Sequence, residues 1–225
     1  MHSHMLQGLD DGSPTVAESL LLLEQLQEWG LHTFYFTPHI FQELYPNTAA
    51  TIDQAYRALK PQLDATLHTG YAAEYMLDHT FDQRIQANEV FLTLPGNYIL
   101  VEMSYIQENK QIERLLFELQ IQGYKPILAH PERYVFYQHD IKKIQRFRDL
   151  GCLLQCNMLS AFGYYGPAEK HVFKRMAEKG LIDLLGTDMH HDRHAKALTM
   201  GLQQVDLQKS VELCRIRNQE LFAFK

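Results

Sequence analysis

Residues 98–102 have the sequence Tyr-Ile-Leu-Val-Glu, an apolar run that ends in a carboxylate. A short apolar run of this kind predicts a buried β-strand. A carboxylate at the inner end of such a strand needs a charged partner or a metal ion, because burying an isolated charge is costly. The stretch therefore predicts a strand and, at its end, a binding site.

Similar short apolar runs alternate with longer amphipathic segments along the 225 residues. We predict strands at 33–37, 67–72, 98–102, 126–129, 152–157 and 182–186. Helices are predicted at 16–29, 51–63, 78–86, 109–122, 140–150, 169–179 and 207–211. Repeated strand–helix alternation is typical of parallel strands covered by helices. With six or seven such units, we expect an α/β fold: a closed or nearly closed (β/α) barrel, formed by residues 1–225 as one domain.

The ends of the predicted strands share a chemical feature. Catalytic residues of a (β/α) barrel lie at the C-terminal ends of its strands, and five predicted strands lead into side chains that bind metals. These side chains are His39, Glu74, Glu102, His130 and Asp188, the last followed by His190. Each alone is weak evidence, since a single histidine is more often structural. Together they indicate a metal site.

The first residues add further candidates. His2 and His4 alternate along the chain, which places both imidazoles on one side if the segment is extended. The Asp10-Asp11-Gly12 sequence that follows is by itself a turn signal. Near the other end, His191 and His194 crowd against His190, and we expect these two at the surface or behind the ligands.

Composition excludes several classes of protein. The net charge of −6, with no compensating basic stretch, argues against nucleic acid as the main partner. No segment has the apolar length of a membrane span, and no secretory signal is present. The three cysteines make an odd count without a disulfide framework, so we expect a reducing, cytoplasmic location. The sequence leaves the oligomeric state open.

These motifs jointly resemble a known family over nearly the whole chain. The matching stretches are His2-Ser3-His4, Leu9-Asp10-Asp11-Gly12, Thr37-Pro38-His39, Ala73-Glu74, Leu100-Val101-Glu102-Met103, Leu128-Ala129-His130-Pro131-Glu132-Arg133, Gly186-Thr187-Asp188-Met189-His190 and the segment 212–222. The sequence is similar to the polymerase and histidinol phosphatase (PHP) superfamily. Within it, the resemblance is to the manganese-dependent tyrosine-protein phosphatases encoded with bacterial capsule and exopolysaccharide genes.

The resemblance implies a distorted (β/α)7 TIM-like barrel, the PHP fold, that holds three divalent metal ions. Manganese is the expected metal, with iron or zinc as alternatives. The implied ligands are His2, His4, Asp11, His39, Glu74, Glu102, His130, Asp188 and His190. Arg133 matches a phosphate-binding arginine of the family, and Arg193 is a candidate for a second one. Family members usually have a short apolar strand directly before His-x-His, whereas only Met1 precedes His2 here.

The implied activity is that of a metal-dependent phosphomonoester hydrolase and protein-tyrosine phosphatase. We hypothesise that a hydroxide bridging the metal ions attacks phosphorus in line. The implied partner is a phosphotyrosine-containing protein, the C-terminal tail of a bacterial tyrosine kinase in capsule or exopolysaccharide regulation. The alternatives are a PHP phosphatase for a small metabolite such as histidinol phosphate, and a non-catalytic regulatory module that retains the barrel. A PHP nuclease is disfavoured by the acidic net charge.

Overall fold

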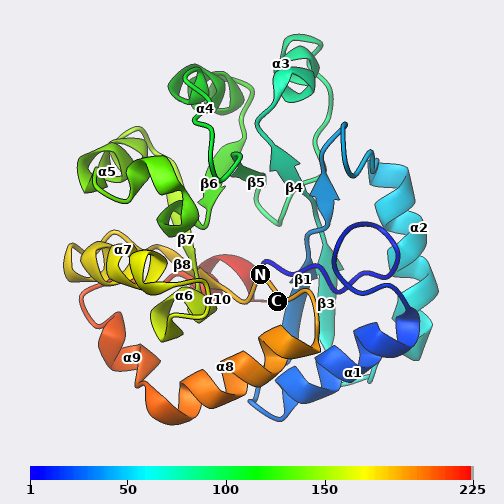
Figure 1. Ribbon diagram of the computed structural model, residues 1–225. Coiled ribbons are helices and arrows are strands. Elements are labelled where there is room, and N and C mark those ends of the chain that lie inside the picture. Colours follow the sequence, from blue (N-terminus) through cyan, green and yellow to red (C-terminus); the bar gives the residue numbers. More distant parts are fainter. Residues whose placement is uncertain (224–225) are drawn as a thin grey trace.

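Parallel strands form the inner wall of the molecule, and helices lie outside them (Figure 1). The computed structural model describes residues 1–223. One sheet has the order β2-β4-β5-β6-β7-β8, and a second pairs β1 with β3. The strands are β1 Thr33–Phe36, β2 His39–Ile40, β3 His68–Tyr71, β4 Glu74–Met76, β5 Tyr98–Glu102, β6 Lys125–Ala129, β7 Leu153–Asn157 and β8 Leu184–Gly186.

The strands surround a distorted barrel with seven positions. β1 continues into β2 after a break at Thr37 and Pro38, and β3 continues into β4 after a similar break, so the eight strands fill six positions. The seventh is filled by Ser3, which forms a parallel bridge with Met189 beyond β8. The Thr37 N–H donates to the Ser3 carbonyl, which joins this segment to the β1 side. The predicted (β/α)7 TIM-like barrel is confirmed.

The helices cover the outer face and the amino-terminal end of this wall. They are α1 Val16–Gln27, α2 Ala49–Leu59, α3 His79–Gln86, α4 Ile112–Ile121, α5 Ile141–Asp149, α6 Met158–Phe162, α7 Pro167–Glu178, α8 Asp192–Gln204, α9 Leu207–Ser210 and α10 Asn218–Phe222. Short 3-10 helices span Lys60–Gln62, Pro131–Arg133 and Val135–Tyr137. Within residues 1–223, no helix combines the length and the hydrophobicity that crossing a bilayer requires.

The barrel interior changes from apolar to polar along the strands. In β5, Leu100 lies in a small inner core with Leu184 of β8 and Phe222 of α10. Side chains alternate across a strand, so Glu102, two residues further on, faces the same interior. The helix α10 closes the amino-terminal end of the barrel, where the Phe222 ring is 5.4 Å from that of Tyr98. The carboxyl-terminal end of the barrel therefore stays open for a binding site.

The predicted elements agree with the structure to within a few residues, with three exceptions. The helix predicted at 51–63 stops at Leu59 and continues as a 3-10 turn, because Pro61 lacks the N–H that an α-helix needs. The short strands β2 and β4 were not predicted, so His39 and Glu74 begin strands instead of following strand ends. The helices α6, α8 and α10 were also missed.

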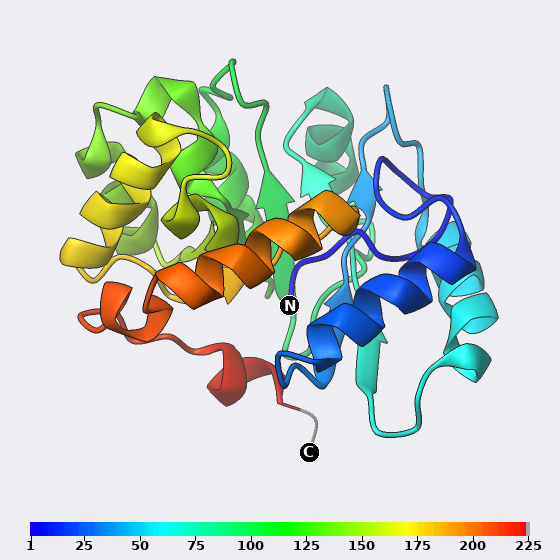
Figure 2. The same cartoon turned by 60° about the horizontal axis from the view of Figure 1, so that its bottom comes forward.

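The helix α8 joins two parts of the molecule. It lies beside α1 (Figure 2), where the Trp29 indole N–H donates to the Thr199 hydroxyl at 3.0 Å. The helix α8 also packs against α6. Gly201 of α8 allows these two helices to approach closely. A Cβ added at Gly201 would lie 2.1 Å from the Phe162 ring.

We expect Gly201→Ala to destabilise the protein. Alanine is the better helix former by about 1 kcal/mol, but overpacking against Phe162 costs about 1–3 kcal/mol and outweighs that gain. Urea unfolding should show a lower free energy of unfolding for this variant. Met200→Ala is the control, since Met200 is exposed on the same helix. Equal or higher stability of Gly201→Ala would contradict the close α6–α8 packing.

Candidate metal centre

Glu74 lies at the centre of a group of imidazoles at the carboxyl-terminal end of the barrel. Its Oε2 is 3.1 Å from His2 Nε2 and 3.2 Å from both His4 Nε2 and His39 Nδ1. Its Oε1 is 3.1 Å from His130 Nε2. The Glu74 side chain is fully buried. Side chains from the N-terminal segment, β2, β4 and the end of β6 therefore meet at one carboxylate.

Asp188 forms a second meeting point beside Glu74. Its Oδ1 is 3.4 Å from His2 Nε2, 3.3 Å from His4 Nε2 and 3.6 Å from His190 Nδ1. Asp188 and His130 both have a positive φ, 48° and 34°, which is unfavourable for residues with a Cβ. Such strain is found mainly at functional sites, where the surrounding structure enforces it.

The outer side of the cluster is formed by Asp11, His39, Glu102 and His190. Glu102 Oε1 lies 2.8 Å from His39 Nδ1. Asp11 Oδ1 is 3.7 Å from His39 Nε2 and 3.5 Å from His190 Nε2. The Asp11 side chain is half exposed, whereas that of Glu102 is buried. This side therefore connects the buried cluster with solvent.

The structure thus brings all nine predicted ligands together. Their ligand atoms form four overlapping groups, each compact enough for one metal ion: His4 with Asp11, His39 and His190; His2 with Glu74 and His130; His2 with His4 and Asp188; and His39 with Glu74 and Glu102. His2 and His4 are fully buried between Thr37 and Met189, so the segment that carries them is held on both sides.

The donor set fits divalent metal ions on chemical grounds. His39 Nδ1 and Glu74 Oε2 are buried 3.2 Å apart, and beyond their ion-pair contacts neither makes a well-aligned hydrogen bond with the described residues. Buried polar atoms are normally paired, so these two call for a ligand. The donors are imidazole nitrogens and carboxylate oxygens, which suit manganese, iron or zinc. Cys152 and Cys156 are buried outside these groups, so no thiolate contributes.

Without cations, His4 and His39 take up protons instead. Burial opposes the charged form of His39, but Glu102 and Glu74 outweigh it and raise its pKa from 6.5 to about 9. Burial also opposes protonation of His4, where Asp10 raises the pKa well above its usual value. The pKa of Glu74 is held well below its usual range, since nearby His2 and His39 outweigh its burial.

A second set of polar residues orients the ligands. Asp10 Oδ2 lies 2.7 Å from His4 Nδ1 and accepts the His39 backbone N–H at 3.0 Å. Asp11, not Asp10, was the predicted ligand, and no role was predicted for Asp10. The structure places Asp10 behind the ligands, where a carboxylate fixes the imidazole ring and raises its basicity.

Two polar residues of β7 act in the same way. Gln155 Oε1 lies 2.6 Å from His2 Nδ1, and the Asn157 amide donates to Asp188 Oδ2 at 2.6 Å. The buried Glu132 carboxylate accepts the Asn157 backbone N–H at 2.9 Å and so anchors the strand end. Gln155 and Asn157 were missed from the sequence. In the sequence they could have been recognised as two polar residues, two positions apart, in an otherwise apolar run. This spacing places both side chains on the same, inward face of the strand.

The two predicted arginines have different environments. Arg133 lies beside the cluster, and its Nη1 donates to Asp188 Oδ2 at 3.0 Å. Arg193 is exposed in the first turn of α8. No hydrogen bond or ion pair joins it to the cluster within residues 1–223. Its role in phosphate binding stays a prediction.

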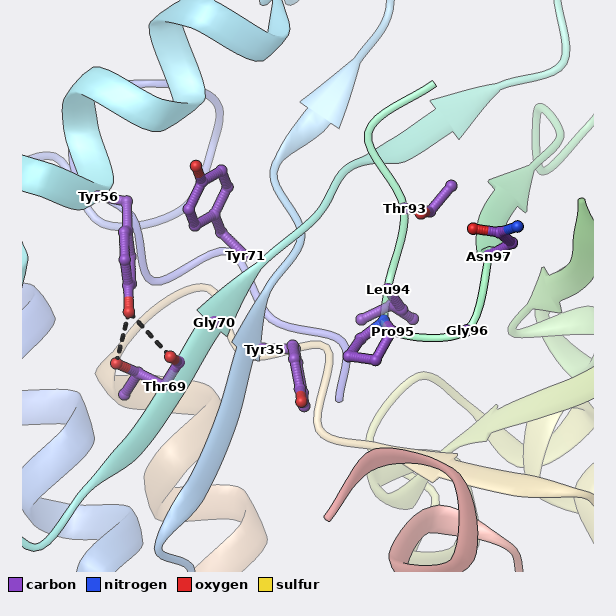
Figure 3. A pocket seen from close by; sticks show the side chains of 10 residues that line it. All are labelled: Tyr35, Tyr56, Thr69, Gly70, Tyr71, Thr93, Leu94, Pro95, Gly96 and Asn97. Atoms are coloured by element: carbon purple, nitrogen blue, oxygen red, sulfur yellow. Dashed lines mark hydrogen bonds between the residues drawn. The ribbon is translucent and has the colours of Figure 1, made fainter. Parts of the chain in front are cut away.

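Another hollow in the surface lies away from this chemistry. It opens beside β3, opposite residues 93–97, and β3 pairs only with β1 (Figure 3). The Tyr56 hydroxyl donates to the Thr69 carbonyl at its border. None of the nine predicted ligands lines this hollow. We therefore take the His-rich cluster as the candidate site.

The raised imidazole pKa values make a prediction about metal-free protein. Protonation stabilises the folded state fully below pH 6.5, and this contribution is lost as the pH rises towards 9, the pKa of His39. Chelator-treated protein should therefore show a falling thermal midpoint between pH 6.5 and 9. Metal-loaded protein should fall less, because cations replace the protons. A metal-free midpoint that is constant or rising over this range would contradict the geometry.

Comparison with known proteins agrees with this site. A family model described as "Capsular polysaccharide synthesis, CpsB/CapC" matches residues 1–212. Tyrosine-protein phosphatase YwqE of Bacillus subtilis is 27% identical over 194 residues, which cover 85% of this chain and 76% of that protein. Tyrosine-protein phosphatase CpsB of Streptococcus pneumoniae is 27% identical over 201 residues, covering 85% and 82%.

A solved structure shows the same fold. The chain superposes with a TM-score of 0.79 and 24% identity on a chain from the crystal structures of YwqE from Bacillus subtilis and CpsB from Streptococcus pneumoniae, metal-dependent tyrosine phosphatases. The match covers 100% of this chain and 98% of that one. The family resemblance predicted from the motifs is confirmed: the chain belongs to the CpsB/CapC family of capsular polysaccharide synthesis.

Proposed function

We propose that this protein is a metal-dependent phosphatase that hydrolyses phosphotyrosine in proteins. The observation that carries the proposal is the convergence of nine imidazole and carboxylate side chains, with Arg133 beside them. The family membership supports it, as do relatives that are named tyrosine-protein phosphatases. Phosphate monoesters are very stable in water, and their hydrolysis depends above all on stabilising negative charge.

Charge explains how an acidic chain can accept a phosphate. Asp11, Glu74, Glu102 and Asp188 together carry a charge of −4, so three divalent ions would leave about +2 at the site. Ions held there would supply an activated water molecule and neutralise phosphoryl oxygens. The residues of the chain position these ions, and Arg133 presents a planar set of N–H donors that matches phosphoryl oxygens.

The leaving group limits what else the site must provide. A tyrosine hydroxyl has a pKa near 10, so a phenolate departs with little protonation. A dedicated general acid is therefore unnecessary for an aryl phosphate. The buried Cys152 and Cys156 are not nucleophiles, because burial raises the pKa of both thiols.

The rim around the site supports a protein substrate over a small polar metabolite. Leu44, in the loop after β2, and Ile106, in the loop after β5, are exposed to 65% and 81%. Both loops leave the carboxyl-terminal end of the barrel, so these apolar side chains lie where a peptide would approach. We further propose that the substrate is the tyrosine-rich tail of a bacterial kinase. A cytoplasmic location fits the three free cysteines.

We expect metal removal and ligand substitution to abolish activity. Chelation, His39→Ala and Glu102→Ala should each lower kcat/KM for an aryl phosphate by about 100-fold or more, since even residues behind a ligand are worth about 10–100-fold. Metal content should be measured in parallel by elemental analysis. His171→Ala, an exposed histidine on α7, is the control. Unchanged activity after chelation or in either ligand variant would rule out metal catalysis here.

Substrate class is tested by direct comparison. The metal-loaded enzyme should hydrolyse a phosphotyrosine peptide with a kcat/KM at least about tenfold above that for histidinol phosphate, because the exposed apolar rim contacts only the peptide. Preference for histidinol phosphate would instead establish the small-molecule phosphatase. Failure to hydrolyse either substrate, with metal bound, would favour a non-catalytic module.

A further inference from the structure

The guanidinium of Arg133 lies between two tyrosine rings. Its Cζ is 4.3 Å from the ring centroid of Tyr105 and 4.0 Å from that of Tyr165. Tyr105 follows β5, Arg133 follows β6, and Tyr165 lies between α6 and α7, beyond β7. Three successive barrel segments thus contribute one side chain each, and the contacts on the guanidinium are of the cation–π kind.

These contacts fix how the guanidinium can move. Both rings contact the guanidinium, and the Nη1 hydrogen bond to Asp188 Oδ2 fixes the position of one end of it. Asp188 is its one hydrogen-bond partner within residues 1–223, so several N–H donors remain free. The Arg133 side chain is 19% exposed, which leaves these donors accessible from the site.

The rings hold the arginine without cancelling its charge. Burial raises the pKa of both the Tyr105 and the Tyr165 hydroxyl, so both rings stay neutral at ordinary pH. The Tyr165 hydroxyl is also 3.4 Å from the Asn157 amide, which itself donates to Asp188. Tyr165 is therefore joined to the same carboxylate that orients Arg133.

We propose that Tyr105 and Tyr165 are positioning residues that clamp the Arg133 guanidinium so that its free N–H groups bind a phosphoryl group. The inference rests on the proposed phosphatase function. A free arginine side chain loses conformational entropy when it binds an anion, and a clamped one has already lost it. The aromatic faces carry this role, while the hydroxyl groups are dispensable.

The test separates the ring from the hydroxyl. Tyr105→Leu and Tyr165→Leu should each lower kcat/KM for an aryl phosphate by about 10–100-fold, the usual effect of a misplaced binding group. Both should also weaken competitive inhibition by inorganic phosphate. Tyr105→Phe and Tyr165→Phe should stay within about threefold of the native enzyme. Tyr164→Leu is the control, because Tyr164 is exposed next to Tyr165 and does not contact Arg133.

A double-mutant cycle excludes a merely structural effect. In an Arg133→Ala background, the leucine substitutions should cause no further loss, since the tyrosines act through Arg133. Metal content and the unfolding midpoint show whether each variant is intact. Methionine replaces leucine at either position if a leucine variant does not fold.

Leucine variants as active as the native enzyme would overturn the clamp. So would phenylalanine variants as impaired as the leucine variants, and losses that persist in the Arg133→Ala background. A loss confined to aryl phosphates and absent for alkyl phosphates would also refute it, because the rings would then contact the substrate itself. Each outcome presupposes an active native enzyme. An inactive native enzyme with metal bound would instead refute the proposed function.

Discussion

Buried negative charge is the constraint on which the rest of this structure depends. Glu74, Glu102 and Asp188 are exposed to 0%, 3% and 2%, and they share one small volume with Asp11 at its edge. Carboxylates this close repel one another and lose most of their hydration, so the arrangement needs positive charge among them. The raised pKa values of His4 and His39 let these two imidazoles supply part of it by taking up protons. Divalent cations would satisfy the same demand and would leave the imidazole lone pairs free to act as ligands.

The barrel tolerates these clustered carboxylates because it separates them from the apolar core. Because side chains alternate along each strand, the same inward face carries Leu100 in the lower barrel and Glu102 at its upper end. Polar groups behind the ligands, among them Asp10 and Gln155, hold the imidazoles in place. The breaks between β1 and β2 and between β3 and β4 place His39 and Glu74 directly opposite each other in register. The fold thus brings donor residues that are distant in sequence next to one another.

Much of this was predictable because the strands and the ligand positions leave local signals. The run at 98–102 is a strand with the predicted bounds, and five ligand candidates, His39, Glu74, Glu102, His130 and Asp188, follow apolar runs. Local signals fail where a residue acts through a partner distant in sequence. Asp10 was passed over because its role depends on His4 and His39 packing around it. The helix α8 was missed because it follows the histidine cluster and contains Gly201, whose function is a contact with Phe162.

The central claim is that these nine side chains enclose a shared group of cations. Anomalous diffraction from crystals grown with manganese, recorded on either side of the manganese absorption edge, tests it most directly. We predict anomalous peaks among Glu74, Glu102, His130 and Asp188, within bonding distance of their nitrogen and oxygen atoms. Crystals that contain manganese but show no anomalous peak among these residues would contradict it.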